Sequence, residues 1–127
     1  PVVRAYATEL GRLLELASPG GMRRQEITAF LEAHARERLT LSMLAHTLHL
    51  SESRTGHLVR ELFGMTFPEL VRAVRLGYAA RMLVLTDEPV GQVAFASGFS
   101  DQNYFTRLFT RAHGLSPRAY RRAHARV

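Results

Sequence analysis

The amino-acid sequence predicts an all-α fold, in which two helix-turn-helix motifs are joined by a long linker helix and preceded by an N-terminal helix. Three observations predict it. Apolar residues recur three and four positions apart in several segments, whereas no stretch combines strict alternation with β-branched residues. Gly and Pro divide the chain into segments of helical length. Finally, a pattern of residues in the middle of the chain recurs towards its end.

Length and composition limit the class of protein. The chain has 127 residues, of which 46% are hydrophobic, and this is enough for one compact domain with a buried core. Cysteine is absent, which excludes disulfides, thiolate metal sites and a thiol nucleophile. No apolar stretch has the length of a membrane span, and the first residues do not resemble a secretion signal. We therefore expect a cytoplasmic protein without a membrane partner.

Positive charge is concentrated in the second half of the chain. All 17 basic residues are arginine, and the formal net charge is +6. Residues 1–63 contain eight Arg and seven acidic residues, a net charge of +1, whereas residues 64–127 contain nine Arg and four acidic residues, a net charge of +5. The planar guanidinium suits phosphate groups and guanine edges. We expect the C-terminal half to bind an anionic partner, although a merely solubilising basic surface is the alternative.

The first segment predicts a helix that is separable from the rest. Residues 2–17 place apolar side chains on one stripe, and Ser18-Pro19-Gly20-Gly21 ends the helix. The chain is thereby divided into an N-terminal helix and linker at 1–21 and a domain at 22–127. The helix either forms a linker or a homodimer contact, or docks onto the domain, and the pattern does not choose between these roles.

Three shorter helices are predicted next. The helix from about 23 to 36 has one apolar face, which consists of Ile27, Phe30, Leu31 and His34. Helices near 41–48 and 52–63 are separated by a short turn, in which Ser51 is a natural N-cap. Two helices this close together predict a first helix-turn-helix motif at about 41–63.

A long helix is predicted at 67–85. Gly64 ends the preceding helix, and the spacing of Thr66 and Glu69 predicts a capping box, in which each side chain satisfies a backbone N–H near the other. The apolar stripe of this helix consists of Leu76, Ala79, Ala80 and Leu83. Nineteen helical residues span about 28 Å.

After Pro89 the earlier pattern recurs and predicts a second motif at about 90–113. The matches are Leu44-Ala45 with Val93-Ala94, Leu50-Ser51 with Phe99-Ser100 and, after one inserted residue, Leu58 with Leu108 and Gly64-Met65-Thr66 with Gly114-Leu115-Ser116. A small Ala lets two helices approach closely, and Gly98 permits a left-handed turn. We expect Ser100 to cap the next helix, as Ser51 does in the first copy.

The second copy resembles a known family. At residues 90–121 the string VGQVAFASGFSDQNYFTRLFTRAHGLSPRAYR is similar to the signature of the AraC/XylS regulators. The residues in register are Ala94, Gly98-Phe99, Phe105, Phe109, Gly114, Pro117 and Tyr120-Arg121. The likeness covers about residues 22–123. It implies two homeodomain-like repeats and a bacterial transcription regulator that binds double-stranded DNA, with RNA polymerase as a partner. Family members usually carry a further sensing or dimerising domain, a second possible source of a homodimer.

Residue types and the resemblance together predict the contacts with DNA. The second helix of such a motif enters the major groove, where its early residues meet base edges. In the second motif the expected base-reading residues share an exposed helix face and are Gln102, Asn103, Thr106 and Arg107. In the first motif the resemblance implies readout by Ser53, Gly56 and His57. Phosphate contacts are expected from Arg54, Arg60, Arg111 and Arg121, although for each the alternative is exposure to solvent without a contact.

The first motif departs from the family pattern. Thr55 and Val59 stand where the family usually has a bulky Leu and a Phe, which predicts a thinner core. Gly56 within the same helix costs about 1 kcal/mol relative to alanine. We therefore expect weaker base reading by the first motif than by the second.

Three other functions are weighed against DNA reading. A metal site would use His46, His49 and His57, but no Asp or Cys joins them and their spacing fits no zinc pattern, so we expect no metal and no cofactor. An enzyme is not expected either, because the chain lacks a phosphate-binding loop, paired carboxylates in an apolar setting and a Ser-His-Asp arrangement. A non-specific nucleic-acid binder, architectural or directed to RNA, is the main alternative, because basic charge alone would serve it.

Overall fold

The computed structural model describes residues 21–125, and this part of the chain consists of seven helices without a strand. The helices are α2 (Gly21–His34), α3 (Leu41–Leu48), α4 (Glu52–Phe63), α5 (Phe67–Leu85), α6 (Val90–Ala96), α7 (Gln102–His113) and α8 (Pro117–Ala123). The all-α prediction is therefore confirmed. The helix predicted at 2–17 lies outside the described residues, and the division of the chain at residue 21 stays a prediction.

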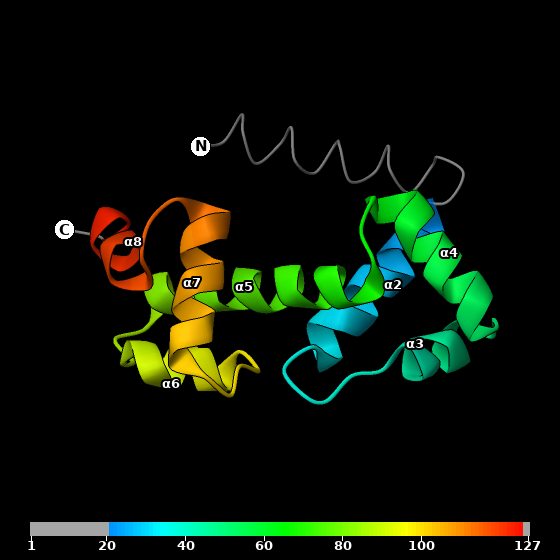
Figure 1. The fold of residues 1–127 in the computed structure, drawn as a ribbon, viewed down its shortest axis with the longest axis horizontal. Helices are drawn as coiled ribbons and strands as arrows, with labels where there is room; N and C mark the ends of the chain where they lie inside the picture. The colour runs from blue at the N-terminus through cyan, green and yellow to red at the C-terminus, as the bar shows by residue number, and fades with distance from the viewer. Residues whose placement is uncertain (1–20, 126–127) are drawn as a thin grey trace.

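The two helix-turn-helix motifs lie at opposite ends of α5 (Figure 1). Helices α3 and α4 form the first motif, and α6 and α7 form the second. Helix α2 packs against α3 and α5, while α8 packs against α5 and α7, so that each motif gains a third helix. Helices α3, α4 and α5 have the predicted bounds, whereas α2 begins and ends two residues before the predicted ones. None of the described helices has the length and apolar character that crossing a membrane requires.

Helix α5 contributes to two separate cores through opposite faces. Phe67, Leu70 and Val71 belong to the core of the first motif. The predicted stripe of Leu76, Ala79, Ala80 and Leu83 is buried, but it belongs to the core of the second motif. A helix turns by about 100° per residue, so Phe67 and Leu76, nine positions apart, face in opposite directions. The single stripe expected from the sequence is therefore one of two.

The two cores differ in the size of their side chains. In the second core Phe105 lies between Phe99 and Phe109, with ring centroids 5.2 and 5.6 Å away. The first core has Thr55 and Val59 at the equivalent positions of α4, and both are completely buried. The Thr55 hydroxyl donates a hydrogen bond to the Ser51 backbone oxygen at 2.8 Å, which satisfies the one polar group of this pair. The smaller side chains agree with the thinner first core that the sequence predicts.

The N-terminal caps position the helices that follow the turns. The Ser51 hydroxyl accepts a hydrogen bond from the Arg54 N–H at 3.1 Å, as predicted. The prediction for Ser100 is wrong, because the Asp101 carboxylate caps α7 and accepts from the N–H groups of Asn103 and Tyr104 at 2.8 and 3.1 Å. The residue inserted in the second copy is Ser100 itself, so Asp101 takes the place equivalent to Ser51.

The capping box of α5 has a different geometry from the predicted one. The Thr66 hydroxyl accepts from the Glu69 N–H at 3.3 Å, as expected. The Glu69 carboxylate, however, accepts a hydrogen bond from the Thr66 hydroxyl, with 3.0 Å between the two oxygens. The first turn of α5 is still fixed by this pair, because both side chains are held in one arrangement.

Candidate nucleic-acid interface

Helix α7 presents the predicted base-reading residues on its accessible side. Phe105 and Phe109 turn completely inward and fix the rotation of the helix, while the Asp101 cap fixes its first turn. The side chains that this arrangement leaves accessible include Gln102, Asn103 and Arg107, which are exposed, and Thr106, which is half-buried. The structure therefore brings all four together on one helix. Thr110, which the sequence analysis did not select, is exposed one turn after Thr106.

Gln102 is held close to α6. A Cβ added to Gly91 of α6 would lie 2.8 Å from the side-chain oxygen of Gln102. The amide group of Gln102 therefore turns back over the first turn of α6, the helix that precedes it in the motif. Arg107 lies near an aromatic ring of its own helix: its guanidinium carbon is 6.0 Å from the centre of the Tyr104 ring.

Helix α4 repeats the arrangement of α7 position by position. The ten residues from Ser51 and the ten from Asp101 have the same sequence of buried, half-buried and exposed positions. Ser53 and His57 are exposed and Gly56 is half-buried, as their equivalents in α7 are. A Cβ at Gly56 would meet only the end of Leu41, at 3.7 Å. The reading face of α4 is therefore accessible but built from smaller side chains.

The two helices carry different charges. Helix α4 contains two Arg and two Glu, whose charges cancel, whereas α7 contains two Arg and no acidic residue, a net charge of +2 with histidine neutral. Because a positive helix is attracted to DNA phosphates, α7 has the stronger electrostatic reason to approach a duplex.

The arginines predicted to contact phosphate fall into two groups. Arg54, Arg60 and Arg111 are exposed. Arg121 is half-buried: its Nε donates to the Leu83 backbone oxygen at 2.9 Å, and its Nη2 is buried without a hydrogen-bond partner. This side chain holds α8 against the end of α5. The position of Arg121 thus supports a packing role and gives no support to the predicted phosphate contact.

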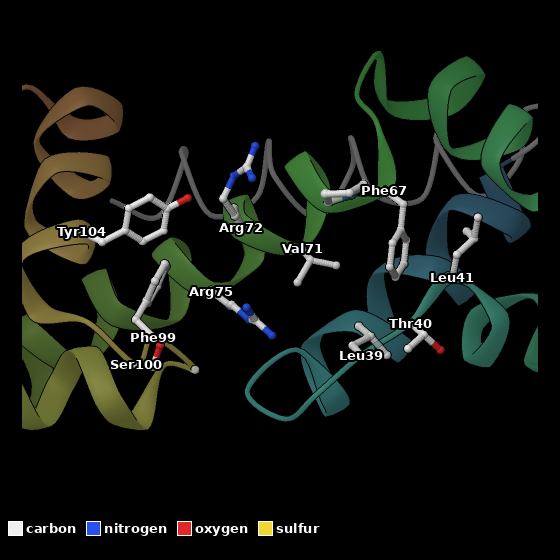
Figure 2. A pocket seen from close by; sticks show the side chains of 12 residues that line it. Leu39, Thr40, Leu41, Phe67, Val71, Arg72, Arg75, Phe99, Ser100 and Tyr104 are labelled. Atoms are coloured by element: carbon white, nitrogen blue, oxygen red, sulfur yellow. The ribbon is translucent and has the colours of Figure 1, made fainter.

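A cavity of about 590 Å³ separates the two motifs along α5 (Figure 2). Phe99 and Tyr104 line it from the second motif, and Leu41 lines it from the first. A hollow beside α4 shares three lining residues with this cavity, namely Leu41, Phe67 and Pro68, and is lined further by the reading residues Ser53, Gly56 and His57. The hollow at the reading face of α4 therefore adjoins the cavity that Tyr104 lines.

Several residues that line this cavity were not predicted from the sequence, among them an arginine and a tyrosine. Arg72 lines the cavity from α5, and Tyr104 lines it from α7 with 40% of its surface exposed. Tyr104 carries a signal in the sequence, because an aromatic residue three positions before Arg107 on a helix lies within reach of the arginine guanidinium. Arg72 carries none, because only the arrangement of the two motifs places it at the cavity.

The histidines do not gather into a metal site. Within residues 21–125 no group of three or more His, Asp or Glu side chains is arranged to hold a metal ion. His49 instead forms the left-handed turn between α3 and α4, with a φ of 58°. Gly98 has the equivalent place in the second motif, with a φ of 97°.

Comparisons with known proteins agree with this architecture. A model of the helix-turn-helix domain family matches residues 44–123. The MmsAB operon regulatory protein of Pseudomonas aeruginosa is 32% identical over 109 residues, which cover 86% of this chain and 36% of that protein. The HTH-type transcriptional activator RhaR of Yersinia pseudotuberculosis is 30% identical over 116 residues, which cover 91% of this chain and 39% of that protein.

A solved structure provides a similar comparison. The crystal structure of the DNA-binding domain of AdpA, in complex with a target DNA, has a TM-score of 0.70 and 29% identity, and the match covers 79% of this chain and 90% of that one. By contrast, the chain spans well under half the length of the two relatives named above.

Proposed function

The chain belongs to the AraC-type helix-turn-helix family of DNA-binding domains, and from this premise we propose that its two motifs read adjacent major grooves of one DNA duplex. The observation that carries the proposal is the repeated arrangement of α4 and α7 at the two ends of α5. The 19 residues of α5 span about 28 Å, close to the ~34 Å repeat of a duplex. One chain would then cover two half-sites on one side of the DNA.

The second motif supplies most of the sequence preference in this proposal. Arg107 would bind guanine through two hydrogen bonds, and Gln102 or Asn103 would bind adenine, each contact being worth about 1 to 3 kcal/mol of discrimination. Thr106 completes the set. In the first motif, reading falls to His57 and Ser53, with Gly56 allowing a close approach.

Exposed arginines would supply the sequence-independent part of the affinity. Arg54, Arg60 and Arg111 lie on the same helices as the reading residues and suit phosphate contacts, which position the protein without reading sequence. Because each neutralised phosphate releases counterions, these contacts would make binding depend on salt.

The wider role is that of a bacterial transcription regulator acting in the cytoplasm, with RNA polymerase as a partner rather than with an enzymatic activity. The regulators named by the comparisons support this role, because most of this chain is similar in sequence to part of an operon regulatory protein and to part of a transcriptional activator. A homodimer, formed through the residues before α2 or through a further domain, belongs to the same proposal.

Selection of bound sites from random DNA, followed by competition, tests the proposal. Arg107→Ala should lower the preference for the selected site by about 5- to 150-fold and weaken binding to random DNA much less. Arg60→Ala should weaken binding to all sequences alike and reduce the salt slope by about 1. Equal loss of specific and random binding in Arg107→Ala would contradict the reading role, and no preference in the parent chain would support non-specific binding instead.

A further inference from the structure

Arg75 connects the middle of α5 to the end of α2 in the first motif. Its Nη2 donates to the Glu37 backbone oxygen at 3.0 Å, and its Nε donates to the Ala35 backbone oxygen. In Figure 2 the side chain points from α5 towards the loop that precedes Leu39 and Thr40. The carbonyls that follow a helix lack partners within it, so the planar guanidinium binds two of these groups at once.

Arg75 is half-buried, so its hydrogen bonds to the two carbonyls differ from contacts made on an exposed surface. Burial lowers the pKa of Arg75, because loss of water disfavours the charged form, although an arginine stays protonated in proteins. A partly desolvated charge is costly unless hydrogen bonds replace its water, and the two carbonyls do so. The side chain is therefore held in one conformation.

The second motif contacts the same group. A Cβ added to Gly98, in the turn between α6 and α7, would lie 3.0 Å from Arg75 Nε and 3.2 Å from the Ala35 backbone oxygen. It would also lie 3.3 Å from the Cα of Arg36. Arg75 thus lies at a point where the turn of the second motif meets the end of α2 in the first motif. We call this point, formed by Ala35, Glu37, Arg75 and Gly98, the joint.

A second contact fastens the end of α2 to α5 one turn further on. Arg36 Nη1 donates to the Tyr78 hydroxyl at 3.1 Å, and the Arg36 guanidinium lies 4.7 Å from the centre of the Tyr78 ring. This pair is exposed, so we expect it to contribute less than the joint.

Away from the joint, the buried packing of the described residues is divided between the two motifs. Their cores form two distinct clusters, and the cavity of about 590 Å³ lies between them. The orientation of one reading helix relative to the other therefore depends on the stiffness of α5 and on the joint.

We propose that Arg75 is a positioning residue, which fixes the orientation of the two motifs and thereby the half-site spacing that the chain accepts. This inference rests on the proposed function, because it requires both motifs to bind one duplex. One added base pair moves a half-site by about 3.4 Å along the duplex and rotates it by about 35°. A rigid chain then loses contacts at one motif, whereas a chain that moves at the joint follows the shifted site.

The first test measures orientation without DNA. Because the chain has no cysteine, Glu61→Cys on α4 and Ala112→Cys on α7 provide two exposed positions for spin labels. We expect one narrow distance distribution in this parent and a broader one after Arg75→Ala. Arg81→Ala is the matched control: it removes an exposed arginine from the same helix, one that lies 5.9 Å from the centre of the Tyr78 ring but does not belong to the joint, and it should leave the distribution narrow. An equally narrow distribution in Arg75→Ala would overturn the inference.

The second test measures affinity for selected sites whose half-sites are moved apart or together by one base pair. The parent chain and Arg81→Ala should lose at least about tenfold in affinity, the equivalent of one base contact. Arg75→Ala should lose clearly less affinity when the half-sites are moved, and it should keep the same preferred bases within each half-site. An identical spacing profile in Arg75→Ala would overturn the inference and leave the proposed function intact.

Two further comparisons keep the tests decisive. If Arg75→Ala fails to fold, Arg75→Lys takes its place, because lysine keeps the charge but cannot bind two carbonyls as a planar fork. Arg75→Lys should broaden the distribution of spin-label distances and the range of half-site spacings that the chain binds. A parent chain without any spacing preference would contradict the proposed function and the spacing role of Arg75 together, whereas the spin-label distances would still report on the joint alone.

Discussion

Gly98 of the second motif lies against Ala35 of the first, so closely that a Cβ on Gly98 would come within 3.2 Å of the Ala35 backbone oxygen. The two residues are 63 positions apart, and Arg75 fills the space beside them. Gly98 has a φ of 97°, a conformation that other residues rarely adopt. Both the conformation and the space at this position thus favour glycine.

Gly98→Ala should destabilise the chain by about 1 to 3 kcal/mol, because alanine is strained at this φ and its Cβ presses on Arg75 and Ala35. Urea denaturation followed by circular dichroism measures the change. Gly77→Ala is the control: apart from the adjoining backbone of its own helix, no atom lies within 4 Å of the added Cβ, and alanine within a helix should stabilise by up to about 1 kcal/mol. Equal stability of Gly98→Ala and the parent would contradict the close packing at the joint.

The start of α7 provides a second prediction. Asp101→Ala should cost about 0.5 to 2 kcal/mol, because two backbone N–H groups lose their acceptor. Ser100→Ala should change stability by less than about 0.5 kcal/mol, because Ser100 is exposed and does not cap the helix. Thermal or urea unfolding compares the stability of the two variants directly. A larger loss of stability in Ser100→Ala would indicate that Ser100, not Asp101, caps α7.

Most of the fold could be predicted because its signals are local. The hydrophobic spacing of 67–85 and the cap at Ser51 follow from neighbouring residues, and both are confirmed. The sequence alone does not place the cap of α7, because the repeat shows that one residue is inserted but not which one. Ser and Asp are both good caps, so residue type alone could not place the insertion at Ser100.

The site could be predicted only as far as it lies on single helices. The four residues chosen on α7 do share its accessible side, because helix periodicity determines which positions face inward. The role of Arg121 could not be predicted, since its acceptor, the Leu83 oxygen, is 38 residues away. The same holds for Arg75 and for the cavity, which exist only once both motifs are placed on α5.

The unequal cores predict unequal costs of truncation. Phe105→Ala should destabilise by about 3 to 5 kcal/mol, because it leaves a cavity among aromatic rings. Thr55→Ala, at the equivalent place in the first core, should cost about 1 to 2 kcal/mol, through the loss of one methyl group and one hydrogen bond. Denaturant midpoints at an unchanged m-value test this order, and a greater loss at Thr55 would show that the first core is the better packed.

Arg121 and Arg122 separate packing from surface charge. Arg121→Ala should cost about 1.5 to 3 kcal/mol, because the Leu83 oxygen loses a charged donor and α8 loses its anchor on α5. Arg122→Ala removes the same charge from an exposed position and should stay within about 0.5 kcal/mol of the parent. Unfolding by urea distinguishes the two variants. Equal, small effects would contradict the packing role of Arg121 and favour the phosphate contact expected from the sequence.

Gly91 offers a way to move Gln102 without changing it. Gly91→Ala would place a Cβ 2.8 Å from the side-chain oxygen of Gln102, so the amide group has to swing away from α6. The fold should tolerate this, because the displaced atom is the end of a flexible side chain and alanine favours the helix by up to about 1 kcal/mol. Gly91→Ala is thus predicted to unfold no earlier than the parent.

The effect of Gly91→Ala should appear in DNA selection instead. We expect the preference at one base position to change or weaken, at the same position that Gln102→Ala affects, while the preference due to Arg107 is retained. Asn103→Ala, on the next residue of α7, is the control and should affect a different position. If Gly91→Ala selects the same site as the parent while Gln102→Ala does not, the contact between Gln102 and α6 is not needed for base reading. The Gln102 amide would then reach the same base equally well from a different rotamer.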